Sequence, residues 1–179
     1  QRDLGSAKLT WSTAPGHTLV ASYFQDPRED AGAINDASHT LNGEPSTYLG
    51  QQEFGGSDYA LRYDGVFANT WILSAQVARH EEENSVGPST AEGAGVQLRD
   101  AQADFFQTGG FGLVQTKEFR RDFYGSSISR LFGHHEVKAG LEYEQQSADV
   151  VKRMSGGQQV DVFANPENAA KFKDVIEYL

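Results

Sequence analysis

The chain has 179 residues, and 15 lysines and arginines stand against 25 aspartates and glutamates, a formal net charge of −10. This acidic excess argues against a nucleic-acid partner, which requires a basic surface. The absence of cysteine excludes disulfide frameworks and zinc-thiolate sites. No apolar run approaches the roughly 18 residues that a membrane-spanning helix needs, but strands that are apolar on one face only would escape that criterion.

The N-terminal part of the chain predicts two short strands. Residues 6–11 place Ala7, Leu9 and Trp11 on one side and polar residues on the other. A turn is expected around Pro15 and Gly16. A second strand follows over residues 17–25, and the polar, glycine-rich residues 26–57 are then expected to form a long loop.

The middle of the chain contains the clearest alternation. In residues 59–67, Tyr59, Leu61, Tyr63 and Phe67 share one face, and residues 71–80 repeat the pattern after a short turn at 68–70. A period of two over adjacent segments predicts a β-hairpin with one apolar and one polar face. Residues 81–117 are again polar and glycine-rich, and a second long loop is expected there.

Two further strands and a helix are expected in the C-terminal part. The first strand covers residues 118–132 with an irregular pattern, and the second covers residues 136–145 with regular alternation. In residues 165–179, Asn165 and Pro166 suit the start of a helix. Apolar residues then recur at spacings of three and four, which predicts a short amphipathic helix.

The connections between these strands suggest an architecture. Tight turns alternate with two connections of roughly thirty residues, whereas loops in compact domains usually have about 4–6 residues. Short turns at one end, long loops at the other and strands of about ten residues are typical of an outer-membrane β-barrel. Aromatic residues near the strand ends would form its two interface girdles; they are Trp11, Phe67, Trp71 and Phe132 at the turn end and Tyr23, Tyr59 and Tyr143 at the loop end.

The predicted fold class is therefore all-β: an antiparallel up-and-down transmembrane barrel segment with short periplasmic turns, long extracellular loops and a short C-terminal loop helix. We count six strands, whereas a closed membrane barrel from one chain needs at least about eight. An open edge cannot lie in lipid, because its backbone groups would lack partners. Residues 1–179 are thus expected to belong to one larger barrel domain. A soluble meander with long loops is the alternative.

Several strings resemble the barrel strands of TonB-dependent outer-membrane receptors, most closely their Oar-like subgroup. They are GSAKLTW, PGHTLVASYFQDP, DYALRYDGVFANTWILSAQVARHEEEN and FRRDFYGSSISRLFGHHEVKAGLEYE. The resemblance implies a 22-stranded barrel, filled by a plug domain, that moves a large ligand across the outer membrane of a Gram-negative bacterium with energy relayed by TonB. It also implies outer-membrane lipid, the plug and the remaining strands as partners.

Two sets of residues are candidates for contact with partners. The polar strand faces would line the lumen, with Arg62 and Asp64 close enough to pair; the candidates there are Arg62, Asp64, Gln76, Lys138, Glu142 and Glu144, and Asp122 is expected to extend them. The opposite face would meet lipid through Leu61, Tyr63, Leu73, Val77, Leu141 and Tyr143. Ligand contacts are expected in the long loops, through Tyr48, Phe54, Phe105 and Phe106.

No motif predicts catalysis, a cofactor or a metal site. The acidic run after His80 lacks the spacing of a calcium loop. Adjacent His134 and His135 would point to opposite sides of a strand. The glycines at 109–112 lack the ending of a phosphate loop. We expect a protein that is not an enzyme. Besides transport, the alternatives are a non-transporting outer-membrane barrel for adhesion or anchoring and a soluble β-sandwich binding module.

Overall fold

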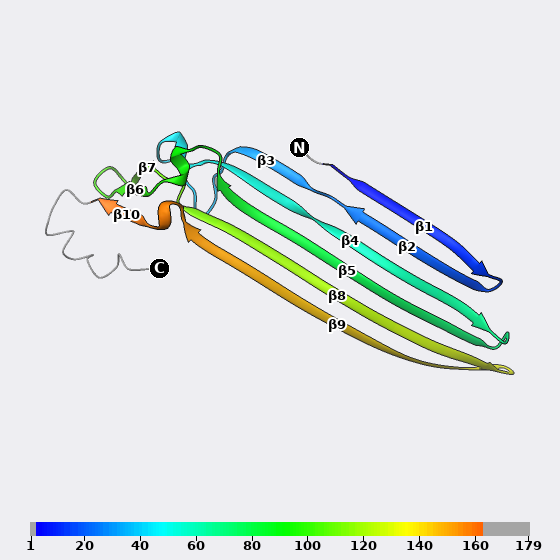
Figure 1. The fold of residues 1–179 in the computed structure, drawn as a ribbon. Helices are drawn as coiled ribbons and strands as arrows, with labels where there is room; N and C mark the ends of the chain where they lie inside the picture. Colours follow the sequence, from blue (N-terminus) through cyan, green and yellow to red (C-terminus); the bar gives the residue numbers. More distant parts are fainter. Residues whose placement is uncertain (1–2, 163–179) are drawn as a thin grey trace. The chain divides into compact units, whose positions relative to one another are not determined.

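Long antiparallel strands dominate the structure, a computed structural model that describes residues 3–162 (Figure 1). The main sheet has the strand order β1-β2-β4-β5-β8-β9, and β3 pairs with β4 beside this path. Its strands are β1 (Gly5–Ala14), β2 (His17–Gln25), β3 (Arg28–Ala33), β4 (Leu49–Phe67), β5 (Trp71–Pro88), β8 (Leu113–Phe132) and β9 (His135–Met154). The predicted all-β, up-and-down antiparallel arrangement is confirmed.

A second, three-stranded sheet has the order β10-β6-β7. It consists of β6 (Gln97–Asp100), β7 (Phe106–Gly109) and β10 (Gln159–Val162), with β10 parallel to β6 and β7 antiparallel to it. Three short 3₁₀ turns complete the described elements: η1 (Pro45–Thr47), η2 (Glu92–Ala94) and η3 (Ser155–Gly157). The helix expected over residues 165–179 lies outside the described residues.

The tight turns were predicted at the right places. Thr70 donates a backbone hydrogen bond to Phe67 at 3.2 Å, and the two residues between them, Ala68 and Asn69, have φ angles of 48° and 58°. Positive φ at both central positions defines the type I′ turn, whose twist matches that of the flanking strands. Gly16 and Gly133 take positive φ angles in the other two turns, where glycine avoids the steric penalty of a side chain.

The two predicted loops were too long, because strands extend into both ranges, and the predicted strands were correspondingly too short. Within residues 26–57, β3 and the first part of β4 form strands, and within residues 81–117, β5 continues to Pro88 and β8 begins at Leu113. The four long strands have 18 to 20 residues each, against the ten or so predicted. Backbone hydrogen bonds can extend a strand whether or not its side chains alternate. Strand ends that are polar throughout, such as residues 81–83, therefore could not be recognised from the sequence pattern.

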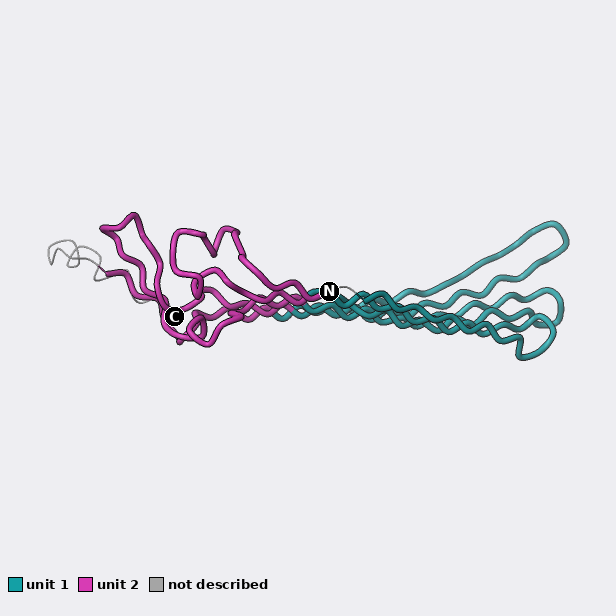
Figure 2. Tube along the Cα trace, turned by 90° about the horizontal axis from the view of Figure 1, so that it is seen from above, with its two compact units in different colours: residues 1–28, 54–83, 118–149 teal, residues 29–53, 84–117, 150–179 magenta. Residues whose placement is uncertain are grey.

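The chain divides into two compact units, which Figure 2 distinguishes by colour. Unit 1 comprises residues 1–28, 54–83 and 118–149, and unit 2 comprises residues 29–53, 84–117 and 150–179. The buried hydrophobic residues of the described chain are Ile34 and Phe111, and both belong to unit 2. The described part of unit 1 therefore has no buried apolar core.

The sheet is open in the described part of the chain. The edge strands are β1 and β9, and neither has a strand on its outer side within residues 3–162. No closed barrel forms from these residues. The edge strand β9 is exposed along almost its whole length, so its outer row of backbone groups is available for pairing with another strand.

Candidate functional site

One face of unit 1 carries continuous rows of large apolar side chains. In the register of β2 and β4, Leu19 lies beside Tyr63, Ala21 beside Leu61 and Tyr23 beside Tyr59. Trp11 and Leu9 of β1 continue these rows, opposite Leu19 and Ala21. Because neighbours in register share a face, three strands contribute to one apolar surface.

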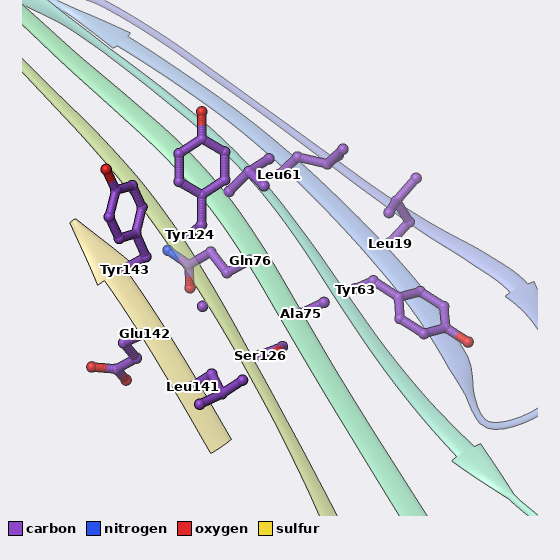
Figure 3. A pocket seen from close by; sticks show the side chains of 12 residues that line it. Leu19, Leu61, Tyr63, Ala75, Gln76, Tyr124, Ser126, Leu141, Glu142 and Tyr143 are labelled. Carbon is purple, nitrogen blue, oxygen red and sulfur yellow. The ribbon is translucent and has the colours of Figure 1, made fainter. Parts of the chain in front are cut away.

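The same surface continues over β5, β8 and β9. Ala75 and Val77 of β5, Tyr124 of β8 and Leu141 and Tyr143 of β9 line one shallow hollow together with Leu61 and Tyr63 (Figure 3). The hollow has a volume of about 560 Å³. The rings of Tyr124 and Tyr143 lie 6.2 Å apart between centroids. We call the surface formed by these rows, from β1 to β9, the apolar face.

Nothing in the described part of unit 1 covers the apolar face. Leu141 is 80% exposed, Tyr143 60% and Trp11 59%. A sheet with one apolar face is normally stabilised by burying that face against another layer. An uncovered surface of this extent is typical of contact with another protein layer or with lipid.

Aromatic side chains lie near both ends of the apolar face. At one end the rings of Tyr23 and Tyr59 are 5.0 Å apart. At the tight-turn end, the His17 ring lies 4.8 Å from Phe67, edge to face. From Tyr59 to Phe67 a strand rise of about 3.3 Å per residue gives about 26 Å, and a tilt of about 40° reduces this to about 20 Å. That is of the same order as the apolar band of membrane barrels, about 25 Å.

The opposite face of unit 1, here called the polar face, carries paired charges. Arg62 contacts Asp64 at 2.8 Å, as predicted, and Ser74 donates a hydrogen bond to the same carboxylate at 2.7 Å. His80 lies 2.9 Å from Asp58. Arg121 donates a hydrogen bond to Glu144 at 2.6 Å, and Gln146 also donates to that carboxylate. These charges of the polar face therefore lie in cross-strand and same-strand pairs.

The other residues predicted for the polar face differ in their contacts. Lys138 and Glu142 lie exposed on β9 and make no ion pair within the described chain. Gln76 lines the hollow described above and a second, smaller one that contains Asp58 and Arg121. Whether this face borders a lumen stays a prediction.

Asp122 is the exception, because it does not extend the polar face. It accepts a hydrogen bond at 2.6 Å from Arg79. Arg79 lies two residues after Val77 on β5, and Asp122 lies two residues before Tyr124 on β8, so each points to the same side as that apolar neighbour. Both charges therefore lie at one end of the apolar face. The alternation of residues 118–132 is too irregular to show this without the neighbouring strand.

The predicted ligand contacts divide between the two units. Phe54 lies in strand β4 of unit 1, and not in a loop, with the Arg28 guanidinium 6.0 Å from its ring. In unit 2, Phe105 has a φ angle of 56°, is half exposed and stacks with Arg99 at 5.7 Å, and exposed Phe106 begins β7. Tyr48, at the end of η1, is half-buried.

Sequence patterns did not indicate the interior of unit 2. His39 is 1% exposed, and its ring lies 4.2 Å from that of fully buried Phe111. Its Nδ1 lies 2.9 Å from Asp36, and its Nε2 donates to the carbonyl of Leu113 at 2.9 Å. Both ring nitrogens therefore have an oxygen partner inside unit 2.

Asp36 is stabilised as a carboxylate in this arrangement. Partial burial would raise its pKa, but hydrogen bonds from the backbone of Ser38 and from the side chain and backbone of His39 outweigh that effect. The pKa of Asp36 is consequently lowered from its ordinary value. Through His39, the Asp36 carboxylate connects the loop before η1 to Leu113 of β8 and so stabilises unit 2.

No group of three or more metal-ligating side chains occurs in residues 3–162. In the same residues, no helix combines the length and hydropathy required to cross a membrane. Comparison with protein-family models found no match, and comparison with curated proteins found no relative. The apolar face and the polar face of unit 1 are therefore the features that bear on function.

Proposed function

We propose that this chain is part of the barrel of a TonB-dependent outer-membrane transporter, with the apolar face against lipid and the polar face toward the lumen. The observation that carries the proposal is the uncovered apolar face of unit 1, which spans six strands and ends in aromatic side chains. In water such a surface would be unfavourable by roughly 25 cal/mol for each Å² of apolar area. In a bilayer the same surface is favourable.

The long strands and their edges support this proposal. A strand that crosses a membrane needs only about 9–11 residues, so strands of 18 to 20 residues can cross and also extend beyond the bilayer. Lipid offers no hydrogen-bond partners, so the free backbone N–H and C=O groups of β1 and β9 would need to pair with the remaining strands of the barrel. The polar face, with its ion pairs, would border a wet lumen and a plug domain.

The transport part of the proposal rests on the resemblance of the strand sequences to TonB-dependent receptors. A non-transporting barrel for adhesion has one observation in its favour. Phe105 and Phe106 are exposed side by side in unit 2, and Phe105 has the left-handed backbone that bulky residues rarely adopt. Strained, exposed aromatic residues of this kind often mark a binding surface.

Membrane fractionation of the protein in its host tests the proposal. We expect the protein in the outer-membrane pellet after an alkaline carbonate wash, and release only by detergent. Recovery in the wash would exclude a membrane barrel. Deletion of the host's TonB then separates the two barrel functions, since uptake through a transporter would stop, whereas adhesion would continue.

A further inference from the structure

Arg130 is a cation on the apolar face that has no anionic partner among residues 3–162. Its guanidinium carbon lies 4.7 Å from the centroid of the Trp71 ring and 4.2 Å from that of Phe132. Within residues 3–162 it makes no ion pair, and its buried Nε–H has no hydrogen-bond acceptor. The guanidinium thus contacts two aromatic rings, and no anion of residues 3–162 pairs with it.

Arg79, another arginine of the apolar face, has a different environment. Arg79, at the opposite end, donates to Asp122, and Asp122 also accepts from Arg120 at 2.9 Å. Unmatched charge in apolar surroundings is unfavourable unless a counter-charge and hydrogen-bond acceptors are supplied. Arg130 therefore lacks what Arg79 has: an acceptor of opposite charge.

The position of Arg130 indicates which acceptor is available. It is near the tight turn at Gly133 and stacks with Trp71, and tryptophan rings in membrane barrels lie at the level of the lipid headgroups. At that depth the abundant anion is the phosphate of a phospholipid. The planar guanidinium matches phosphate geometry with two parallel N–H donors.

On the basis of the barrel function proposed above, we propose that Arg130, clamped by Trp71 and Phe132, binds the phosphate of an anionic phospholipid at the tight-turn end of the apolar face. The two rings orient the guanidinium and contact the glycerol and upper acyl region of the same lipid. The phosphate supplies the acceptors and the negative charge that the described chain lacks around Arg130. The polar face does not contribute to this site.

Lipid retention by the full-length protein tests the site. The protein is reconstituted in bilayer discs of equal phosphatidylglycerol and phosphatidylcholine, and the lipids that stay bound after transfer to detergent are counted by native mass spectrometry. We expect preferential retention of phosphatidylglycerol. Arg130→Gln should reduce that preference about fivefold, which corresponds to about 1 kcal/mol for one basic residue near an anionic surface. Arg130→Lys should keep most of it.

The matched control is Arg79→Gln, an arginine on the same face whose charge is already paired; it should leave the preference unchanged. Excess inorganic phosphate should not abolish the preference, and if it does, the site binds free phosphate and the lipid assignment is wrong. An unchanged preference in a membrane-inserted Arg130→Gln protein would overturn the inference while leaving the barrel intact. If the wild-type protein needs no detergent, the barrel itself is excluded.

Discussion

The Arg79 guanidinium donates a hydrogen bond to the Asp122 carboxylate at 2.6 Å, from β5 to β8, at one end of the apolar face. Between this pair and Arg130, most side chains of the face are apolar or aromatic. Charges at both ends thus limit the apolar region along the strands. In the proposed barrel, these charges would lie at the two borders of the surface that meets lipid.

Leu141→Lys should strongly reduce insertion of the protein. Leu141 is the most exposed large apolar side chain of the face, and a lysine near the bilayer midplane is unfavourable by about 2–4 kcal/mol. The free energy of folding into lipid vesicles, measured by urea titration, reports the change. Glu142→Lys, one residue further on and on the opposite side of β9, is the control and should be mild. Equal effects of the two would contradict the assigned faces.

Replacement of Asp122 by alanine should destabilise the protein slightly, because it leaves Arg79 and Arg120 without their shared carboxylate. The urea midpoint in detergent micelles measures this. Arg120→Gln removes only one of the two contacts and should have the smaller effect. A larger effect of Arg120→Gln would mean that the pair of Arg79 and Asp122 contributes little.

Ala68→Gly should stabilise the turn between β4 and β5. Alanine at a φ angle of 48° is strained, and the left-handed conformation is unfavourable by about 1–2 kcal/mol for a residue with a side chain. Loss of backbone freedom offsets part of the gain, so the net increase in the free energy of unfolding should be about 0.5–1 kcal/mol. Thr70→Gly, at a position without positive φ, should instead destabilise, and the opposite order would exclude a type I′ turn.

Phe111→Ala should unfold unit 2 selectively. The Phe111 side chain is fully buried, and such truncations are unfavourable by about 3–5 kcal/mol. Amide hydrogen exchange should accelerate in residues 29–53 and 84–117 and remain slow in the unit 1 strands. The control is Phe106→Ala, which removes an exposed ring of unit 2. Uniform acceleration over both units would show that they unfold together.

Unit 2 should lose stability in acid through Asp36. The pKa of Asp36 is lowered in the folded chain, so the carboxylate stabilises the fold at pH values above its ordinary value of 3.8. This stabilisation is lost as the pH falls through the folded pKa. Hydrogen exchange of unit 2 measured from neutral pH downward should show the loss, and Asp36→Asn should be less stable at neutral pH and less sensitive to acid. Identical pH profiles would rule out this role for Asp36.

The sequence predicted the strands where side chains alternate and the turns where backbone chemistry is distinctive. Tyr59, Leu61 and Tyr63 share a face because the β-strand period is two, and that is a local property. Strand ends were missed where the side chains do not alternate, as at residues 81–83. Asp122 was assigned to the wrong face because the pattern of its strand is irregular. Which way its side chain points becomes clear only from its contact with Arg79 on the neighbouring strand.

Local sequence by itself therefore determined the two-faced strands, the tight turns and the pairing of Arg62 with Asp64 two residues later. Only the tertiary structure decided that six strands join one apolar face, that Arg130 contacts Trp71 and Phe132, and that His39 packs with Phe111 in unit 2. The physical reason is that alternation depends on one strand alone. Registers between strands and contacts between distant residues depend on backbone hydrogen bonds and packing that no single segment encodes.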